Sequence, residues 1–112
     1  MLKIRVDIKP LSSNMAWQGR RFSTKAKTQF ENAMRLLLPS TKVCGRPHYR
    51  VAYDFHLVNF ARTDVDNLIK TTQDCLVKRG IISDDRMIVS LAARKFKSEK
   101  DRIEITIEGV EI

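Results

Sequence analysis

The sequence predicts a single α+β domain over residues 1–112, in which a small mixed sheet of about four strands carries two helices on one face. Four segments alternate apolar and polar side chains with the period of two that marks a half-buried strand. Two further segments space their apolar side chains as an amphipathic helix does. No internal repeat or low-complexity linker divides the chain, and its length suits one domain. The predicted order is β-α-β-α-β-β.

The first half of the chain predicts a strand, a loop and a helix. Residues 2–8 alternate cleanly and form the first strand. Residues 11–24 are polar and show no period, so we expect a loop or flap. A helix follows, because Ser23 or Thr24 can cap it and helical spacing continues to about Leu38.

The second half predicts a strand, a helix and two more strands. Residues 49–59 alternate most regularly, and a helix over residues 66–79 ends at Gly80, a suitable C-cap. Residues 87–96 and 101–108 form the last two strands. The side chains expected to point inward are Tyr49, Val51, Tyr53, Phe55 and Leu57, then Met87, Val89, Leu91 and Ala93, then Ile103, Ile105 and Ile107.

The charge of the chain is large and unevenly placed. The net charge is +8 and the pI is near 9.9. Residues 1–63 hold 12 Lys and Arg against 3 Asp and Glu, whereas residues 64–112 hold 9 against 10. This asymmetry indicates an anion-binding front half with an acidic site behind it, although a generic basic protein of ribosomal type shares the composition.

Composition also argues against several classes of protein. No apolar stretch is long enough to span a membrane, and the N-terminus lacks a signal-peptide pattern. Cys44 and Cys75 have neither the spacing of a metal site nor a disulfide-rich context, so we expect reduced thiols in a cytoplasmic protein without zinc.

Aspartates concentrate in residues 62–86. Asp64 and Asp66 lie at the predicted entry to the second helix, where a strand-to-helix turn lets the two carboxylates converge. Lys70 and Asp74 follow at steps of four and share the helix face of Asp66. Asp84 and Asp85 enter the next strand, which we expect to carry Asp85 back towards Asp66.

This pattern suits metal-dependent cutting of a polyanion. Mg²⁺ takes hard oxygen ligands and lowers the pKa of a bound water. We therefore interpret Asp64, Asp66 and Asp85 as ligands of Mg²⁺, and Lys70 as the cation at the phosphate that is cut. Simpler interpretations remain open: an N-cap at Asp64, a ladder of salt bridges along the helix, and a turn at Asp85.

The loop from Asn14 to Thr24 places aromatic side chains beside arginines, a combination that suits phosphate contact and base stacking. An alternative is that its aromatic side chains pack under the flap. The residues predicted to bind DNA are Asn14, Trp17, Arg20, Arg21, Lys25, Lys27 and Arg62.

Two runs of sequence resemble a known family. Asp-Val-Asp-Asn-Leu-Ile-Lys at 64–70, then Asp74, then Gly-Ile-Ile-Ser-Asp-Asp at 80–85, resembles the RusA family of Holliday-junction resolvases, which bacteria and their prophages encode. Residues 10–24 resemble that family's N-terminal loop. The resemblance implies a small homodimer that binds four-way DNA junctions and makes paired Mg²⁺-dependent nicks. It also matches the family's essential acids to Asp64, Asp66 and Asp85, and its catalytic lysine to Lys70.

The expected function is therefore that of a Mg²⁺-dependent crossover junction endodeoxyribonuclease, acting in DNA recombination and repair. Two alternatives remain. The chain could be a non-catalytic, basic nucleic-acid-binding module whose acids only cap a helix, or a ribonuclease.

Overall fold

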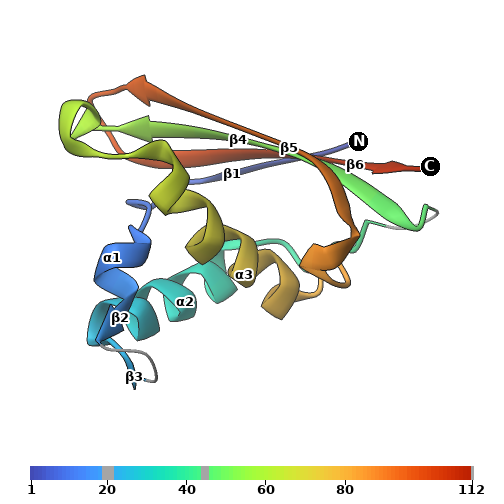
Figure 1. Ribbon diagram of the computed structural model, residues 1–112, viewed down its shortest axis with the longest axis horizontal. Coiled ribbons are helices and arrows are strands. Elements are labelled where there is room, and N and C mark those ends of the chain that lie inside the picture. The colour runs from blue at the N-terminus through green and yellow to red at the C-terminus, as the bar shows by residue number, and fades with distance from the viewer. Residues whose placement is uncertain (19–21, 44–45, 112) are drawn as a thin grey trace.

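The computed structural model describes residues 1–18, 22–43 and 46–111, and within them it contains a four-stranded mixed sheet of order β1-β6-β4-β5 (Figure 1). β6 pairs antiparallel with β1 and with β4, while β4 and β5 run parallel. The strands are β1 (Leu2–Val6), β4 (His48–Leu57), β5 (Ile88–Lys97) and β6 (Arg102–Val110). The predicted α+β class and the order of the main elements are confirmed.

Two helices, α2 (Lys25–Leu37) and α3 (Ile69–Arg79), lie on the same face of the sheet (Figure 1). Thr24 caps α2, since its Oγ1 accepts a hydrogen bond of 3.2 Å from the backbone N–H of Lys27. Gly80 closes α3 in the left-handed conformation with φ 81°, as expected for a C-cap glycine. No helix in the described ranges is both long enough and apolar enough to cross a bilayer.

Short elements that the sequence did not predict surround these helices. The expected loop at residues 11–24 was partly wrong, because it contains the helix α1 (Ser13–Ala16) and the paired strands β2 (Trp17–Gln18) and β3 (Phe22–Ser23). Single 3₁₀ turns form η1 (Phe60–Arg62), η2 (Val65–Leu68) and η3 (Asp85–Met87). Elements of two to four residues are too short to show a period, and for this reason they were missed.

The core lies between the sheet and the two helices. The strand side chains predicted to point inward from β4 and β6 are all buried, because these strands lie in the middle of the sheet. The apolar side chains that the helices and their connections add to this buried core are Phe30, Met34, Leu38, Leu68, Cys75, Leu76, Ile81 and Ile82. This single cluster holds the first turn of α3 against the sheet, and the candidate site is built on that turn.

The prediction that Val89 and Leu91 point inward was wrong. Their exposed fractions are 48% and 47%, whereas Val51, the residue of β4 in register with Leu91, is buried; Val89 lies at a shift in register between the two strands. β5 is an edge strand with β4 as its neighbour, and it contacts mainly the η1 and η2 turns rather than α2 or α3. Its apolar side chains therefore extend beyond the cover that the helices provide.

Candidate active site

Lys70 contacts two carboxylates of the acidic segment, one in its middle and one near its end. It lies in the first turn of α3, and its Nζ is 2.9 Å from Asp74 Oδ1 and 3.0 Å from Asp85 Oδ2. The hydrogen bonds to Asp74 and then to Asp85 raise the pKa of Lys70. Its side chain remains 63% exposed, so this ammonium group faces solvent between two carboxylates.

Asp84 and Asp85 have separate partners. Asp84 accepts a hydrogen bond of 2.9 Å from the backbone N–H of Arg86 and another from its guanidinium group. These bonds, the backbone one first, lower the pKa of Asp84. Asp84 therefore caps the η3 turn, and Asp85 is the carboxylate that approaches Lys70.

Asp64 and Asp66 do not cap a helix. Asp64 occupies the position before η2, but its side chain makes no capping hydrogen bond. Both side chains are exposed, and neither forms a hydrogen bond or ion pair with any residue that the structure describes. Asp66 lies in a 3₁₀ turn instead of the α-helix, so the salt bridge from Asp66 to Lys70 in the alternative ladder interpretation is not formed. The salt bridge from Lys70 to Asp74 is formed.

The three predicted metal ligands are not gathered into one group. In the described ranges, no three or more His, Cys, Asp or Glu side chains are placed to hold a metal ion together. The parallel pairing of β4 and β5 gives the reason. Asp64 follows the carboxyl end of β4, whereas Asp85 precedes the amino end of β5, which lies beside Tyr49 at the start of β4. The ligand set of Asp64, Asp66 and Asp85 stays a prediction.

Tyr53 lies near Asp74 and Asp85, the two partners of Lys70, and the sequence predicts it only as an inward-pointing strand residue. It is fully buried, and its hydroxyl donates a hydrogen bond of 3.1 Å to Gln73 Oε1 on α3. Burial, and then the charges of Asp74 and Asp85, raise the pKa of Tyr53, so the phenol stays neutral. A tyrosine on the inward face of a strand needs a hydrogen-bond partner for its hydroxyl. This requirement is the feature of the sequence that could have predicted a polar contact at Tyr53.

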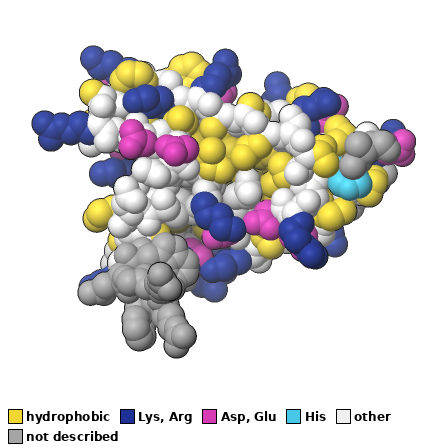
Figure 2. Space-filling model, viewed as in Figure 1, with side chains coloured by type: hydrophobic (Ala, Val, Ile, Leu, Met, Phe, Trp, Pro, Cys, Tyr) yellow, Lys and Arg dark blue, Asp and Glu magenta, His cyan; other side chains and the backbone are white. Residues whose placement is uncertain are grey.

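The face that carries α3 mixes charges of both signs. Figure 2 shows basic and acidic side chains next to one another over the helices, with apolar side chains between them. This mixture is expected where a basic chain concentrates its aspartates in one segment. The arrangement places cations that can contact phosphate groups close to carboxylates.

The residues predicted to bind DNA are spread over several elements. Lys25 is exposed at the start of α2, but Lys27 is half-buried and its Nζ lies 3.2 Å from Glu31 Oε1. Trp17 lies in β2, opposite Ser23. Arg20 and Arg21 lie outside the described residues.

Asn14 and Arg62 come together with Asp64 around one hollow. They are 48 residues apart in the chain, yet both line a cavity of about 560 Å³ that Asp64 also lines. Both side chains are exposed. The structure thus places two of the predicted DNA contacts beside one of the predicted metal ligands.

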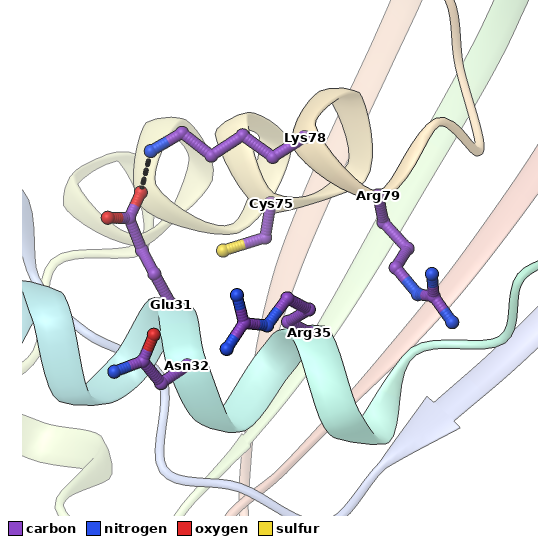
Figure 3. Close-up of a pocket in the computed structure, with 6 residues that line it drawn as sticks. All are labelled: Glu31, Asn32, Arg35, Cys75, Lys78 and Arg79. Carbon is purple, nitrogen blue, oxygen red and sulfur yellow. Dashed lines mark hydrogen bonds and ion pairs between the residues drawn. The ribbon is translucent and has the colours of Figure 1, made fainter.

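A second cavity, of about 330 Å³, lies between α2 and α3 and holds a thiol (Figure 3). The thiol of Cys75 is buried, and burial, followed by the charge of Glu31, raises the pKa of Cys75 to about 12. Lys78 pairs with Glu31 across the two helices. A neutral, buried thiol is not a nucleophile at neutral pH, so Cys75 packs the helices, as expected.

Comparisons with known proteins agree with the resemblance read from the sequence. A family model described as "Endodeoxyribonuclease RusA" matches residues 12–108. A protein of Lactococcus phage r1t, described as crossover junction endodeoxyribonuclease rusA, is 50% identical over 50 residues. That match covers 45% of this chain and 38% of the phage protein, so the chain spans well under two thirds of that relative's length.

Proposed function

The chain belongs to the RusA family of endodeoxyribonucleases, and on that premise we propose that it is a Mg²⁺-dependent enzyme that cuts four-way DNA junctions. Its role is to resolve Holliday junctions by paired symmetric nicks during DNA recombination and repair. The observation that carries the proposal is the contact between Lys70 of α3 and Asp85 of η3. This contact joins a cation to carboxylates on the surface of a chain of net charge +8.

The available carboxylates suit Mg²⁺. In proteins this ion is held by one or two carboxylates, while water and substrate phosphate complete its shell. Asp64 and Asp66 are exposed and bind no described residue, so they would hold the ion, with Asp85 as the third candidate. When bound, Mg²⁺ lowers the pKa of a water ligand and neutralises charge at the phosphate.

Lys70 contributes the protein's own cation. Its ammonium group has three donors and its side chain is largely exposed, so it can turn from Asp74 to a phosphate oxygen while it keeps Asp85. A positive charge at that oxygen stabilises the negative charge that develops as the phosphodiester is cut. Asp74 and Asp85 hold the ammonium group at the surface until DNA arrives.

End-labelled four-way junctions, incubated with Mg²⁺ or with EDTA, test the function. We expect symmetric nicks on two opposing strands with Mg²⁺ alone. Lys70→Ala should lower the single-turnover rate by about 100-fold or more, and it should hardly change the melting temperature, because an exposed ion pair contributes only ~0–1 kcal/mol. Binding without cutting would instead identify a nucleic-acid-binding module, and preferential cutting of duplex RNA would identify a ribonuclease.

We infer further that two copies act together. A four-way junction has near two-fold symmetry, and in a C₂ dimer each copy would supply one Lys70–Asp85 cluster. β5 is the surface that best supports pairing, because it is an edge strand that directly follows Asp85 and η3. Val89 and Leu91 are about half exposed on it, and a second copy would cover both the open edge and these apolar side chains.

Sedimentation of two matched variants tests this surface. Leu91→Lys adds a charge on β5 and should shift the protein from dimer to monomer. Leu36→Lys adds the same charge on α2, where Leu36 is 83% exposed, and should leave the dimer intact. A wild-type monomer at micromolar concentration that still makes paired nicks would refute the dimer, and dissociation by Leu36→Lys alone would move the interface to α2.

A further inference from the structure

The cavity beside Asp64 has an apolar floor. It is lined by the segment before α1, by α1 and α2, and by residues in or next to the η1 and η2 turns. Phe30 and Leu68 are buried at its base, and Ile8 and Leu11 pack against the same core. Its volume of about 560 Å³ lies in the range of pockets that hold small organic ligands, about 300–1,000 Å³.

Four amide side chains from four separate segments line this cavity: Asn14, Gln29, Asn59 and Asn67. Their side chains make no hydrogen bond with any part of the protein that the structure describes. Each amide offers both a donor and an acceptor. The cavity can therefore bind a flat ligand that carries donors and acceptors along its edge and needs an apolar surface under its face.

Charged side chains complete the rim. Lys9 and Arg62 line the cavity together with Asp64 and can contact phosphates that flank a bound nucleotide. We propose that this cavity receives an unstacked nucleobase of the DNA strand that is cut, beside the phosphate served by Asp64. The proposal rests on the nuclease function above. It gives the nuclease site a pocket that recognises the identity of a base next to the cut.

The chemistry of the lining favours a base over a phosphate. Asn and Gln side chains pair in bidentate fashion with the edge of a base, and an apolar or aromatic surface covers its face. A free phosphate would find an apolar floor and the repelling carboxylate of Asp64. Bases at a branch point have lost a stacking neighbour, so drawing one of them out of the stack costs least there.

Equilibrium binding in EDTA, in which no strand is cut, measures the contact between base and cavity. Four-way junctions are prepared intact and with single abasic nucleotides at each position flanking the branch. Removal of the bound base should weaken wild-type binding about 10-fold. Ala26→Phe fills the cavity, so this variant should bind the intact junction as weakly as wild type binds the abasic one, with no further loss on the abasic junction.

A second variant and a control complete the design. Gln29→Ala removes one exposed amide without filling the cavity. It should reduce the loss of binding affinity that an abasic nucleotide causes, and it should also weaken the preference among the four bases at the nick. Asn32→Ala removes an exposed amide from the same helix, but Asn32 lines the other cavity, so this variant should behave as wild type. Melting curves show whether each variant folds; if Ala26→Phe does not, Gln29→Ala decides the result.

Three results would overturn the proposal: wild-type binding that ignores every abasic position, a full abasic penalty retained by the cavity variants, or no binding to intact junctions. Nicking with Mg²⁺ on the same preparations separates this inference from the function on which it rests. Nicks without dependence on the base would refute the base pocket alone. Base-dependent binding without nicks would refute the nuclease alone.

Discussion

Asp84 and Asp85 are adjacent in the chain, yet the η3 turn directs their carboxylates to different partners. Asp84 is satisfied by the backbone and side chain of Arg86, so it contributes to the shape of the turn. Asp85 is held by Lys70 at the surface of α3. A carboxylate held by an exposed lysine remains accessible to a metal ion, whereas one that caps its own turn is already occupied.

Asn substitutions at the two aspartates should have different consequences for catalysis. Asp85→Asn is expected to lower the single-turnover rate of junction nicking at least about 100-fold, because it removes the negative charge of a proposed Mg²⁺ ligand that also positions Lys70. Asp84→Asn should cut within a few-fold of wild type and should show a slightly lower melting temperature, because it weakens the η3 turn. The same preparations serve for both measurements, and a larger loss of rate in Asp84→Asn would reverse the assignment.

Among the elements, α3 is tied to the start of the chain by a buried threonine. Thr71 Oγ1 lies 2.6 Å from the backbone oxygen of Leu11, in the segment between β1 and α1. Thr72, which is also buried, donates instead to Leu68 O within its own helical segment, at 3.0 Å. Thr71 Oγ1 also lies 3.3 Å from Leu68 O, so both threonines make a local bond and Thr71 adds a tertiary one.

Valine substitutions measure that difference. Thr71→Val should cost about 1 kcal/mol in the free energy of unfolding, because a buried carbonyl loses its donor. This loss corresponds to a melting temperature about 4 °C lower. Thr72→Val should cost less, since the carbonyl of Leu68 keeps helical partners and a hydroxyl bonded within its own helix stabilises little. Urea titrations of both variants test this, and equal losses would argue against a tertiary role for Thr71.

Glu31 on α2 pairs with two lysines, one of which links α2 to α3. Its carboxylate pairs with Lys27 on its own helix and with Lys78 on α3. Burial acts to raise the pKa of Glu31, but the bonds to Lys78 and Lys27 outweigh it, and the net result is a pKa below the ordinary value of 4.5. Glu31 therefore stabilises the fold above that ordinary value and loses its contribution as the pH falls through the lowered pKa.

Glu31→Gln should consequently destabilise the protein at about pH 7, and this destabilisation should fade as the pH falls through the lowered pKa of the wild-type carboxylate. Urea denaturation of both proteins at several pH values gives the difference in the free energy of unfolding. Glu99→Gln is the matched control, because Glu99 is exposed and pairs with no described residue. A difference for Glu31→Gln that does not change with pH would show that charge is not the cause.

The elements that could be predicted from sequence are those whose pattern is local and long. α2, α3, β4 and β6 each repeat an apolar period over nine or more residues, and Thr24 and Gly80 mark ends with their own chemistry. The exposure of β5 could not be predicted, because alternation indicates two faces but not which strand lies at the edge. The contact between Lys70 and Asp85 depends on β5 running parallel beside β4. The alternation of apolar and polar residues predicts a half-buried strand but does not show whether it pairs in the parallel or the antiparallel direction.

Across the whole molecule, the excess of positive charge lies in residues 1–63 and predicts strong dependence of DNA binding on salt. Replacing Arg20 and Arg21 together with Gln should flatten the slope of log affinity against log salt by about 2, at ~0.9 for each lost phosphate contact. Both arginines lie outside the described residues, so this prediction rests on the sequence. Lys3→Gln with Arg5→Gln on β1 removes the same charge elsewhere, and an equal effect from that pair would indicate non-specific attraction.

The position of β1 has a consequence for how the chain is made. β1 pairs with β6, so that Leu2 lies opposite Ile107, and both neighbours of β4 follow it in sequence. A chain emerging from the ribosome can form α2 early, but it cannot complete the sheet until β6 has been synthesised. The pairing of the first and last strands closes a long loop, and such contacts form late and slowly. During that interval the apolar faces of β1 and β4 are open to other chains, which makes the nascent chain more prone to aggregation than the finished fold.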